Sequence, residues 1–251
     1  MITYEYPLNE RVRTLLRLED LFDRVDFFIS QEGPLDHQAA LTSIFEILEV
    51  ASRGDLKSDL LQELDRQRLF LEALRGNPAI SEERLDAVVA EIEASFADLL
   101  ASAGKTGLHL RENEWLMTIK QRAAIPGGIC EFDLPSYHHW LHRDHAHRRV
   151  DLEAWRLPLN SVAAALRIVL RVLRESGKST ALIAYRGVFQ QAPMERAAHM
   201  LRLTLRRDVG CVPEISANKY ALNIRFILPG SVQRTKLYEA DVEFDLTYCN
   251  L

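Results

Sequence analysis

Between residues 9 and 104 the apolar residues recur three and four positions apart, which is the period of an amphipathic helix. Turn signals divide this stretch into four segments: Gly33-Pro34, Gly54 and Gly76-Asn77-Pro78. Asp36 and Ser81 are expected to cap the second and fourth helices, because short polar side chains bond the free amides of a first turn. Four amphipathic helices with short links predict an antiparallel bundle over residues 9–104.

After the glycine-containing loop 103–107 the period changes. Apolar and polar residues then alternate through several segments, as in antiparallel strands with one solvated face: 201–206, 220–226 and 242–248. The same alternation at Ile2, Tyr4 and Tyr6 predicts that strand 1–7 joins this β layer. The predicted fold class is therefore α+β, with the bundle inserted between the first strand and a β-rich domain of residues 105–251.

The β-rich domain is expected to carry extra helices. A short helix around residues 112–122 leads to a glycine turn at 126–128 and to a predicted strand at 129–134. Ser136 is expected to cap a helix that holds several histidines. A more apolar helix, from about residue 160 to Gly177, is expected to pack against the sheet.

The charge and cysteine content narrow the class of protein. The chain has 31 Lys plus Arg against 36 Asp plus Glu, a net charge of −5, which does not favour bulk nucleic-acid binding. The 3 cysteines show no CxxC spacing and are expected to be reduced thiols. Neither a signal peptide nor a membrane-spanning run is present in the sequence. We therefore expect a cytoplasmic protein with no membrane partner.

Two short fragments imitate nucleotide-binding loops, Ser176–Thr180 and Gly104–Thr106. A phosphate-binding loop needs a further glycine five residues earlier, between a strand and a helix, and both fragments lack it. The sequence also lacks a nucleophile elbow and a cysteine in a catalytic context. Composition and spacing thus indicate no catalytic site and no cofactor.

Histidines gather in one segment of the chain, which offers His138, His139, His142, His145 and His147. On one helix, His138 and His142 would share a face, as would His138 and His145 approximately, so zinc binding and a metal-dependent hydrolase form one hypothesis. The neighbouring arginines 143, 148 and 149 oppose a dication. The favoured interpretation is an exposed basic helix, with Trp140 and Leu141 turned inward and imidazoles available to an anionic partner.

Basic residues also follow the predicted strands. If segments 200–206 and 219–227 are neighbours, they form a basic stripe from Arg202, Arg206, Lys219 and Arg225. The acidic segment 239–245 could instead lie opposite and neutralise this stripe. Both alternatives stay open from the sequence, because opposite charges across strands are a common stabilising arrangement.

Several motifs resemble one protein family along nearly the whole chain. The most specific is the run Ile125–His142, IPGGICEFDLPSYHHWLH, which is accompanied by Pro7–Glu19 and Asp59–Gln67. Shorter matches are Arg53-Gly54, Leu110–Glu112, Gln121-Arg122, Leu201–Leu203, Pro213–Ser216, Lys219 and Ile224–Phe226. On these residues the chain resembles the ZapD (YacF) family, which implies a helical domain and a β-sandwich-like domain.

The resemblance implies a non-enzymatic role in cell division. Proteins of that family bind the C-terminal tail of FtsZ and, as homodimers, cross-link and bundle FtsZ protofilaments in the division ring (Z-ring) at midcell during septation. Basic groups carry the FtsZ contact in the family. By motif match the expected partner-binding residues here are Arg17, Arg53, Arg111, His138, Lys219 and Arg225.

Overall fold

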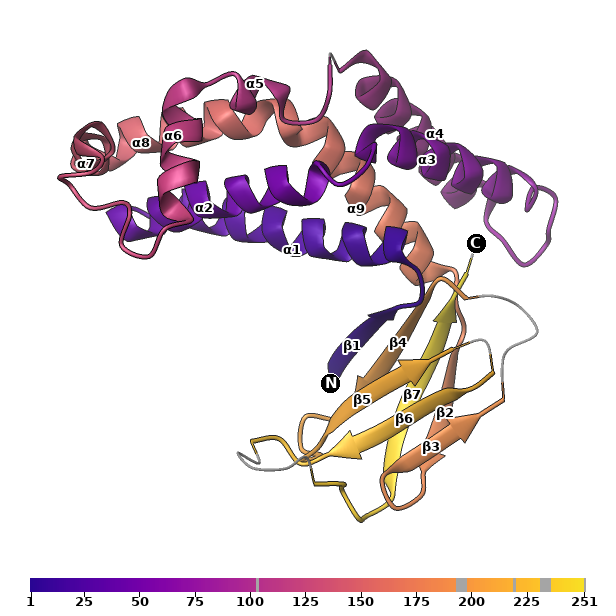
Figure 1. The fold of residues 1–251 in the computed structure, drawn as a ribbon. Helices are drawn as coiled ribbons and strands as arrows, with labels where there is room; N and C mark the ends of the chain where they lie inside the picture. Colours follow the sequence, from indigo (N-terminus) through magenta and orange to yellow (C-terminus); the bar gives the residue numbers. More distant parts are fainter. Residues whose placement is uncertain (103, 193–197, 219, 231–235, 251) are drawn as a thin grey trace. The chain divides into compact units, whose positions relative to one another are not determined.

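The computed structural model describes residues 1–102, 104–192, 198–218, 220–230 and 236–250. The chain forms two compact units, which are visible in Figure 1. Residues 14–169 form the helical unit, and residues 1–13 with 170–251 form the β unit. The helical unit is thus inserted between the first strand and the rest of the β unit, and the predicted α+β fold class is confirmed.

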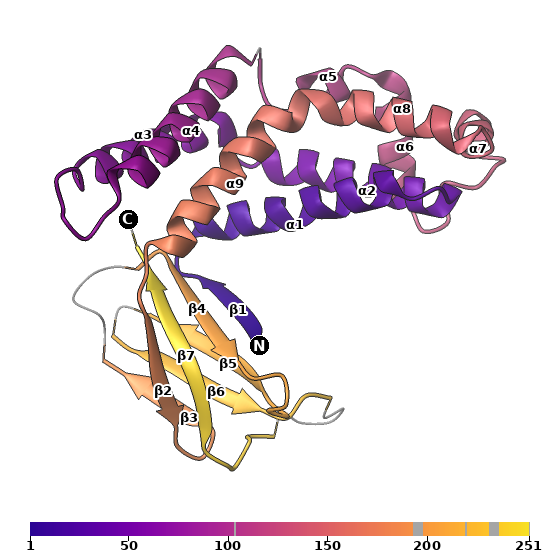
Figure 2. The same cartoon turned by 180° about the vertical axis from the view of Figure 1, so that it is seen from behind.

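The helices follow the chain in a simple order. Their bounds are α1 (Glu10–Ser30), α2 (Pro34–Ala51), α3 (Leu56–Glu72), α4 (Glu82–Ala101), α5 (Leu108–Arg111), α6 (Glu114–Ala123), α7 (Pro135–Leu141), α8 (His145–Arg156) and α9 (Asn160–Glu175), with the 3-10 helix η1 (Leu157–Leu159) before α9. Figures 1 and 2 both show α1 beside α2 and α3 beside α4, each pair antiparallel. Buried leucines and isoleucines of the helical core come from these four helices and from α5, α6, α8 and α9.

The caps of these helices follow local chemistry. Ser81 accepts a hydrogen bond from the Arg84 amide at 3.4 Å and caps α4, as predicted. Asp36 was predicted to cap α2, and this was wrong, because the helix already begins at Pro34. A proline in the first turn of a helix has no amide hydrogen that needs a partner, and its φ angle already suits a helix. Helix α2 therefore starts at Pro34, before Asp36.

The compact units divide at residues 13 and 169, whereas the sequence placed the domain boundary between 104 and 105. Helices α5 to α8 belong to the helical unit. Helix α2 contacts α6, α7 and α8. These three helices are joined to one another by an aromatic cluster of Trp115, Tyr137, Trp140 and Trp155, whose contacting rings have centroids 5.7 to 6.3 Å apart. This cluster contains all 3 tryptophans of the chain.

Residues 129–134 form turns, so the strand predicted there was wrong. The amides of Asp133 and Leu134 both donate to the carbonyl of Cys130, at 3.1 and 2.9 Å, which closes the chain on itself. Local bonds of this kind satisfy the backbone without a neighbouring strand. Ser136 was also wrongly predicted as a cap: α7 starts at Pro135, and the Ser136 hydroxyl accepts from Trp115 Nε1 at 3.0 Å.

The β unit is a sandwich of two antiparallel sheets. The strands are β1 (Ile2–Pro7), β2 (Ser179–Ala184), β3 (Val188–Gln191), β4 (Met200–Leu205), β5 (Val212–Ala217), β6 (Leu222–Ile227) and β7 (Val242–Cys249). They are ordered β1-β4-β7-β2 in one sheet and β3-β6-β5 in the other, and Figure 2 shows the first sheet in front of the second. Alternate residues such as Leu203, Phe226 and Phe244 are buried between the sheets.

The N-terminal strand is attached by a carboxylate as well as by its ladder to β4. Glu5 accepts hydrogen bonds from Arg174 Nε and Nη2, both at 2.8 Å, and from Arg202 Nε at 3.0 Å. Such bidentate, charge-assisted bonds fix geometry more firmly than a single contact does. Glu5 therefore links β1 to β4 and to the last turn of α9 within the β unit.

A buried guanidinium joins α8 to the turn between α1 and α2. Arg148 is 4% exposed. It donates from Nη2 to the Glu32 carbonyl at 2.7 Å and from Nη1 to the Leu141 carbonyl at 3.0 Å. Its Nε donates at 3.0 Å to Nδ1 of His37, which is fully buried. The predicted exposed basic helix is therefore wrong at Arg148, which is part of the core.

His37 is neutral in this arrangement. Nδ1 accepts from Arg148, so Nε2 carries the proton and donates to the Gln31 carbonyl at 2.9 Å. Burial lowers the pKa of His37 below its ordinary value of 6.5, and the charges of Arg148 and Arg149 lower it further. Protonation of Nδ1 would remove the acceptor for Arg148 and place two cations side by side.

We expect the unfolding free energy of the protein to decrease as the pH falls below 6.5. The unfolded chain takes up a proton at His37 there, while the folded chain does not, and the effect ends once the pH is below the lowered pKa. The slope from this residue is at most about 1.4 kcal/mol per pH unit. Urea unfolding followed by tryptophan fluorescence at several pH values measures it.

The matched variant is His37→Gln, whose amide can accept from Arg148 and donate to Gln31 without titrating. It is expected to lose the part of the slope that belongs to His37. An identical pH dependence for the variant and the wild type would contradict this assignment.

Candidate partner-binding site

A glycine brings the loop before α5 against the last turns of α2. Gly107 has a φ of 73°, in the left-handed region, and a Cβ at this position would lie 2.2 Å from Leu48 Cδ2. Glycine is the residue that tolerates both conditions. The close approach places α5 so that Arg111 Nη2 donates to the Leu48 carbonyl at 3.0 Å.

A second cation reaches the same helix end from α6. Lys120 forms an ion pair with Glu49, in the last turn of α2. The hydrogen bond and charge of Lys120 lower the pKa of the Glu49 carboxyl, and the charges of Arg111 and Arg53 lower it further. Arg53, which lies in the turn after α2, is therefore within electrostatic range of the same carboxylate.

Two lysines extend this group on the side of α3 and α4. Lys57 Nζ donates to the carbonyls of Ser102 and Leu100, at 2.6 and 3.3 Å. The pKa of Asp55 is lowered, first by hydrogen bonds from Ser58 and then by the charges of Lys105 and Lys57. We call the whole group the α2-end cluster: the cations Arg53, Lys57, Lys105, Arg111 and Lys120 around the carboxylates of Glu49 and Asp55.

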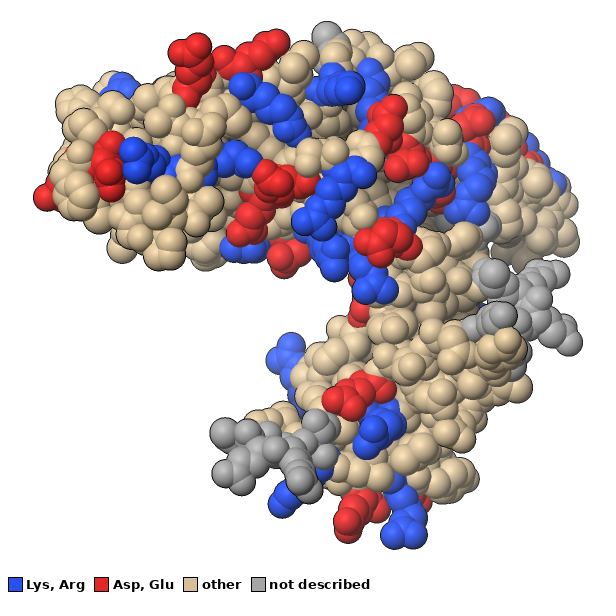
Figure 3. Space-filling view, viewed as in Figure 1, with Lys and Arg blue, Asp and Glu red and all other residues tan. Residues whose placement is uncertain are grey.

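As defined, the α2-end cluster groups five cations with two carboxylates. The carbonyl end of a helix dipole stabilises cations, so α2 favours this gathering. Arg53 and Arg111 are both exposed. In Figure 3, basic and acidic side chains are interleaved over the visible face of the helical unit, which therefore shows no uniformly basic surface.

Two of the residues that the sequence predicted, Arg53 and Arg111, both lower the pKa of the Glu49 carboxyl through their charges. Arg17 lies exposed on α1, and Arg225 lies exposed on β6 in the β unit. Lys219 lies outside the described residues. The sequence missed Lys57, Lys105 and Lys120. Lys105 belongs to the fragment Gly104–Thr106, which imitates a nucleotide-binding loop. Its position near α2 depends on the close approach of Gly107 to Leu48.

The predicted basic stripe is not formed. Arg202 lies on β4 of one sheet and Arg225 on β6 of the other, so the two strands are not neighbours. Arg202 is paired with Glu5 on β1, and Arg206 is paired with Asp208. Opposite Arg225 on β5 stands Glu214. The pairing of strands across two sheets, which the alternation does not encode, explains the difference.

The histidines also lie differently from the prediction. α7 ends at Leu141 and α8 begins at His145, so His138 and His145 are on separate helices. His138 is half-buried, its ring 4.3 Å from that of His142 between centroids, and its carbonyl accepts from His142 Nδ1 at 2.8 Å. Within the described part of the chain, no three His, Cys, Asp or Glu side chains come together as metal ligands would.

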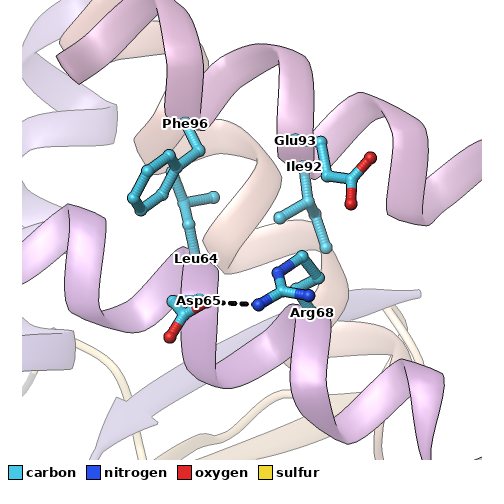
Figure 4. Close-up of a pocket in the computed structure, with 6 residues that line it drawn as sticks. All are labelled: Leu64, Asp65, Arg68, Ile92, Glu93 and Phe96. Atoms are coloured by element: carbon cyan, nitrogen blue, oxygen red, sulfur yellow. Dashed lines mark hydrogen bonds and ion pairs between the residues drawn. The ribbon is translucent and has the colours of Figure 1, made fainter.

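A pocket lies between α3 and α4, with a volume of about 170 Å³. Figure 4 shows an apolar floor of Leu64, Ile92 and Phe96, with Glu93 and the ion pair of Asp65 and Arg68 at its rim. Pockets for small-molecule ligands usually measure about 300 to 1,000 Å³. This one has room for a single side chain.

Comparison with known proteins agrees with the resemblance of the motifs. The family model described as ZapD, cell division protein, matches residues 16–225. The chain belongs to the ZapD family. Relatives named cell division protein ZapD occur in Dechloromonas aromatica, 58% identical over 252 residues, and in Azoarcus sp. strain BH72, 57% identical over 251 residues. The alignment covers 100% of both chains in each case.

Membership of the ZapD family assigns the chain to cell division. The relative from Nitrosomonas eutropha, 55% identical over 251 residues, carries the same name. No helix in the part of the chain that the structure describes is both long and apolar enough to cross a membrane.

We expect Gly107→Ala to lower the unfolding free energy by about 1–2 kcal/mol, because the left-handed φ and the contact with Leu48 both disfavour a Cβ. The matched control is Gly54→Ala, where a Cβ meets nothing within 4 Å. Urea unfolding of both variants measures the difference. Equal unfolding free energies for the two variants would show that a side chain at position 107 causes no strain where this loop contacts α2.

Proposed function

We propose that this chain is a non-enzymatic, cytoplasmic cell division factor that binds the C-terminal tail of FtsZ. As a homodimer it would cross-link and bundle FtsZ protofilaments and so promote assembly of the division ring at midcell. The observation that carries the proposal is the α2-end cluster in a member of the ZapD family. It contains Arg53 and Arg111, two residues that the family resemblance assigns to the FtsZ contact.

The chemistry of the cluster suits an acidic, flexible tail. Cationic side chains form charge-assisted hydrogen bonds with carboxylates, including a terminal carboxylate. Arg53 is exposed, and within the described residues its side chain has no ion pair or hydrogen bond, so a partner can bind it without breaking a contact. Arg17, His138, Lys219 and Arg225 remain proposed contacts on the same grounds of family resemblance.

Cross-linking follows from symmetry and from the repetition of tails along a filament. Two-fold dimers carry two copies of each site, and a polymer of FtsZ offers many tails. A single site with a dissociation constant in the micromolar range, about −8 kcal/mol, is sufficient once the second binding step becomes intramolecular. Bundling therefore needs the dimer, whereas binding of one tail does not.

We expect Arg53→Glu to weaken binding of a synthetic FtsZ C-terminal peptide by roughly 2- to 10-fold without a change in melting temperature. Arg111→Glu should weaken binding and also lower the melting temperature, because Arg111 holds the Leu48 carbonyl. The control is Arg84→Glu, an exposed arginine at the start of α4. Fluorescence anisotropy of the labelled peptide measures binding, and equal affinity for all three variants would remove the cluster from the site.

The function as a whole is tested by co-sedimentation with GTP-polymerised FtsZ. We expect the protein to pellet with full-length FtsZ and not with FtsZ that lacks its C-terminal peptide. Electron microscopy of the same samples should show bundles only in the first case. Pelleting that is independent of the peptide, or no pelleting with either polymer, would overturn the proposal.

A further inference from the structure

The carboxylate at the centre of the α2-end cluster stands in an unfavourable place for its own helix. Glu49 lies in the last turn of α2, where the carbonyl end of the helix dipole disfavours a negative charge. That turn contains no basic residue of its own. The cations that offset the charge of Glu49 come from other segments, namely Lys120, Arg111 and Arg53.

Glu49 has the chemistry of the ligand that the cluster is proposed to bind. Its carboxylate forms the ion pair with Lys120, and the Glu49 side chain is 60% exposed, while that of Lys120 is 28% exposed. An exposed ion pair contributes little to stability, so an external carboxylate can compete for the same ammonium group. Arg111 is held differently, because its guanidinium donates a hydrogen bond to the Leu48 carbonyl, which does not involve the Glu49 side chain.

We propose that Glu49 is a specificity-determining residue of this site: an internal carboxylate that occupies Lys120 until an acidic partner segment displaces it. The inference rests on the proposed function for the identity of the partner, but the displacement itself requires only a carboxylate-bearing peptide. An apolar or amide-bearing segment cannot form an ion pair with Lys120, so it does not displace Glu49 and does not bind. Specificity then comes from an element that disfavours the wrong partner as well as from attraction to the right one.

The test compares Glu49→Gln with a matched control on the same helix. Glu46→Gln removes a carboxylate one turn earlier, which pairs with Arg24 on α1 at 3.2 Å and lies outside the cluster. We expect Glu49→Gln to bind the FtsZ C-terminal peptide about 2- to 5-fold more tightly than the wild type at low ionic strength. Glu46→Gln should bind as the wild type does.

Salt and peptide chemistry supply readouts that a purely structural role of Glu49 would not change. The gain should shrink at high ionic strength, since exposed charges are then screened. It should also be absent for a version of the peptide whose carboxylates are replaced by amides. Unchanged melting temperatures and tryptophan emission for both variants would establish that they fold normally.

A second probe separates this inference from the proposed function. Tetraglutamate carries the carboxylates without the FtsZ sequence, and its binding is followed by amide shifts in NMR spectra. If Glu49→Gln strengthens tetraglutamate binding while the FtsZ peptide binds neither protein, the displacement holds and the proposed partner fails. If the FtsZ peptide binds wild type, Glu46→Gln and Glu49→Gln equally, Glu49 has no such role and the proposed function still stands.

Discussion

The helical unit depends on burying the Arg148 guanidinium, a charge whose described hydrogen-bond acceptors are carbonyl oxygens and one neutral imidazole. A buried cation is costly unless its donors are all met, so each acceptor has to be in place together. The acceptors come from the turn between α1 and α2, from the first turns of α2, and from the end of α7 with the turn after it. The position of α8 is consequently coupled to that of the helix pair that begins the bundle.

Helix α2 connects this constraint to the binding chemistry. Its first turns carry His37, which has to stay neutral, and its last turn carries the Glu49 carboxylate, which has to stay charged to hold Lys120. The two ends therefore have opposite electrostatic requirements. The residues around the last turn arrive from the turn at Arg53, the start of α3, the loop at Gly107 and the end of α6, so the cluster exists only in the folded helical unit.

Signals carried by one short segment predicted the structure better than tertiary pairing did, although the caps assigned to Asp36 and Ser136 were wrong, because each of those helices already begins at a proline. The cap at Ser81 and the alternating strands were predicted correctly, because a side chain bonding its own turn and a half-buried face are properties of a short segment. The separation of Arg202 from Arg225 depends on which strands meet, and the alternation does not specify this. The turns at 129–134 are instead closed by local hydrogen bonds to the Cys130 carbonyl. Tertiary contacts also limited the prediction of the candidate site. Family motifs indicated Arg53 and Arg111, whereas Lys57, Lys105 and Lys120 were assigned to the cluster only from the folded structure, through contacts such as that of Gly107 with Leu48.

The ladder between β1 and β4 affects the order in which the two units of the protein can fold. Thr3 and Thr204 bond each other across 201 positions of the chain, so the first strand has no partner until most of the polypeptide has been synthesised. The helical unit is complete in sequence by residue 169. Because domains tend to fold as units during synthesis, the helical unit can fold on the ribosome while β1 is still unpaired. The β unit then folds last, although β1 is synthesised before the helical unit.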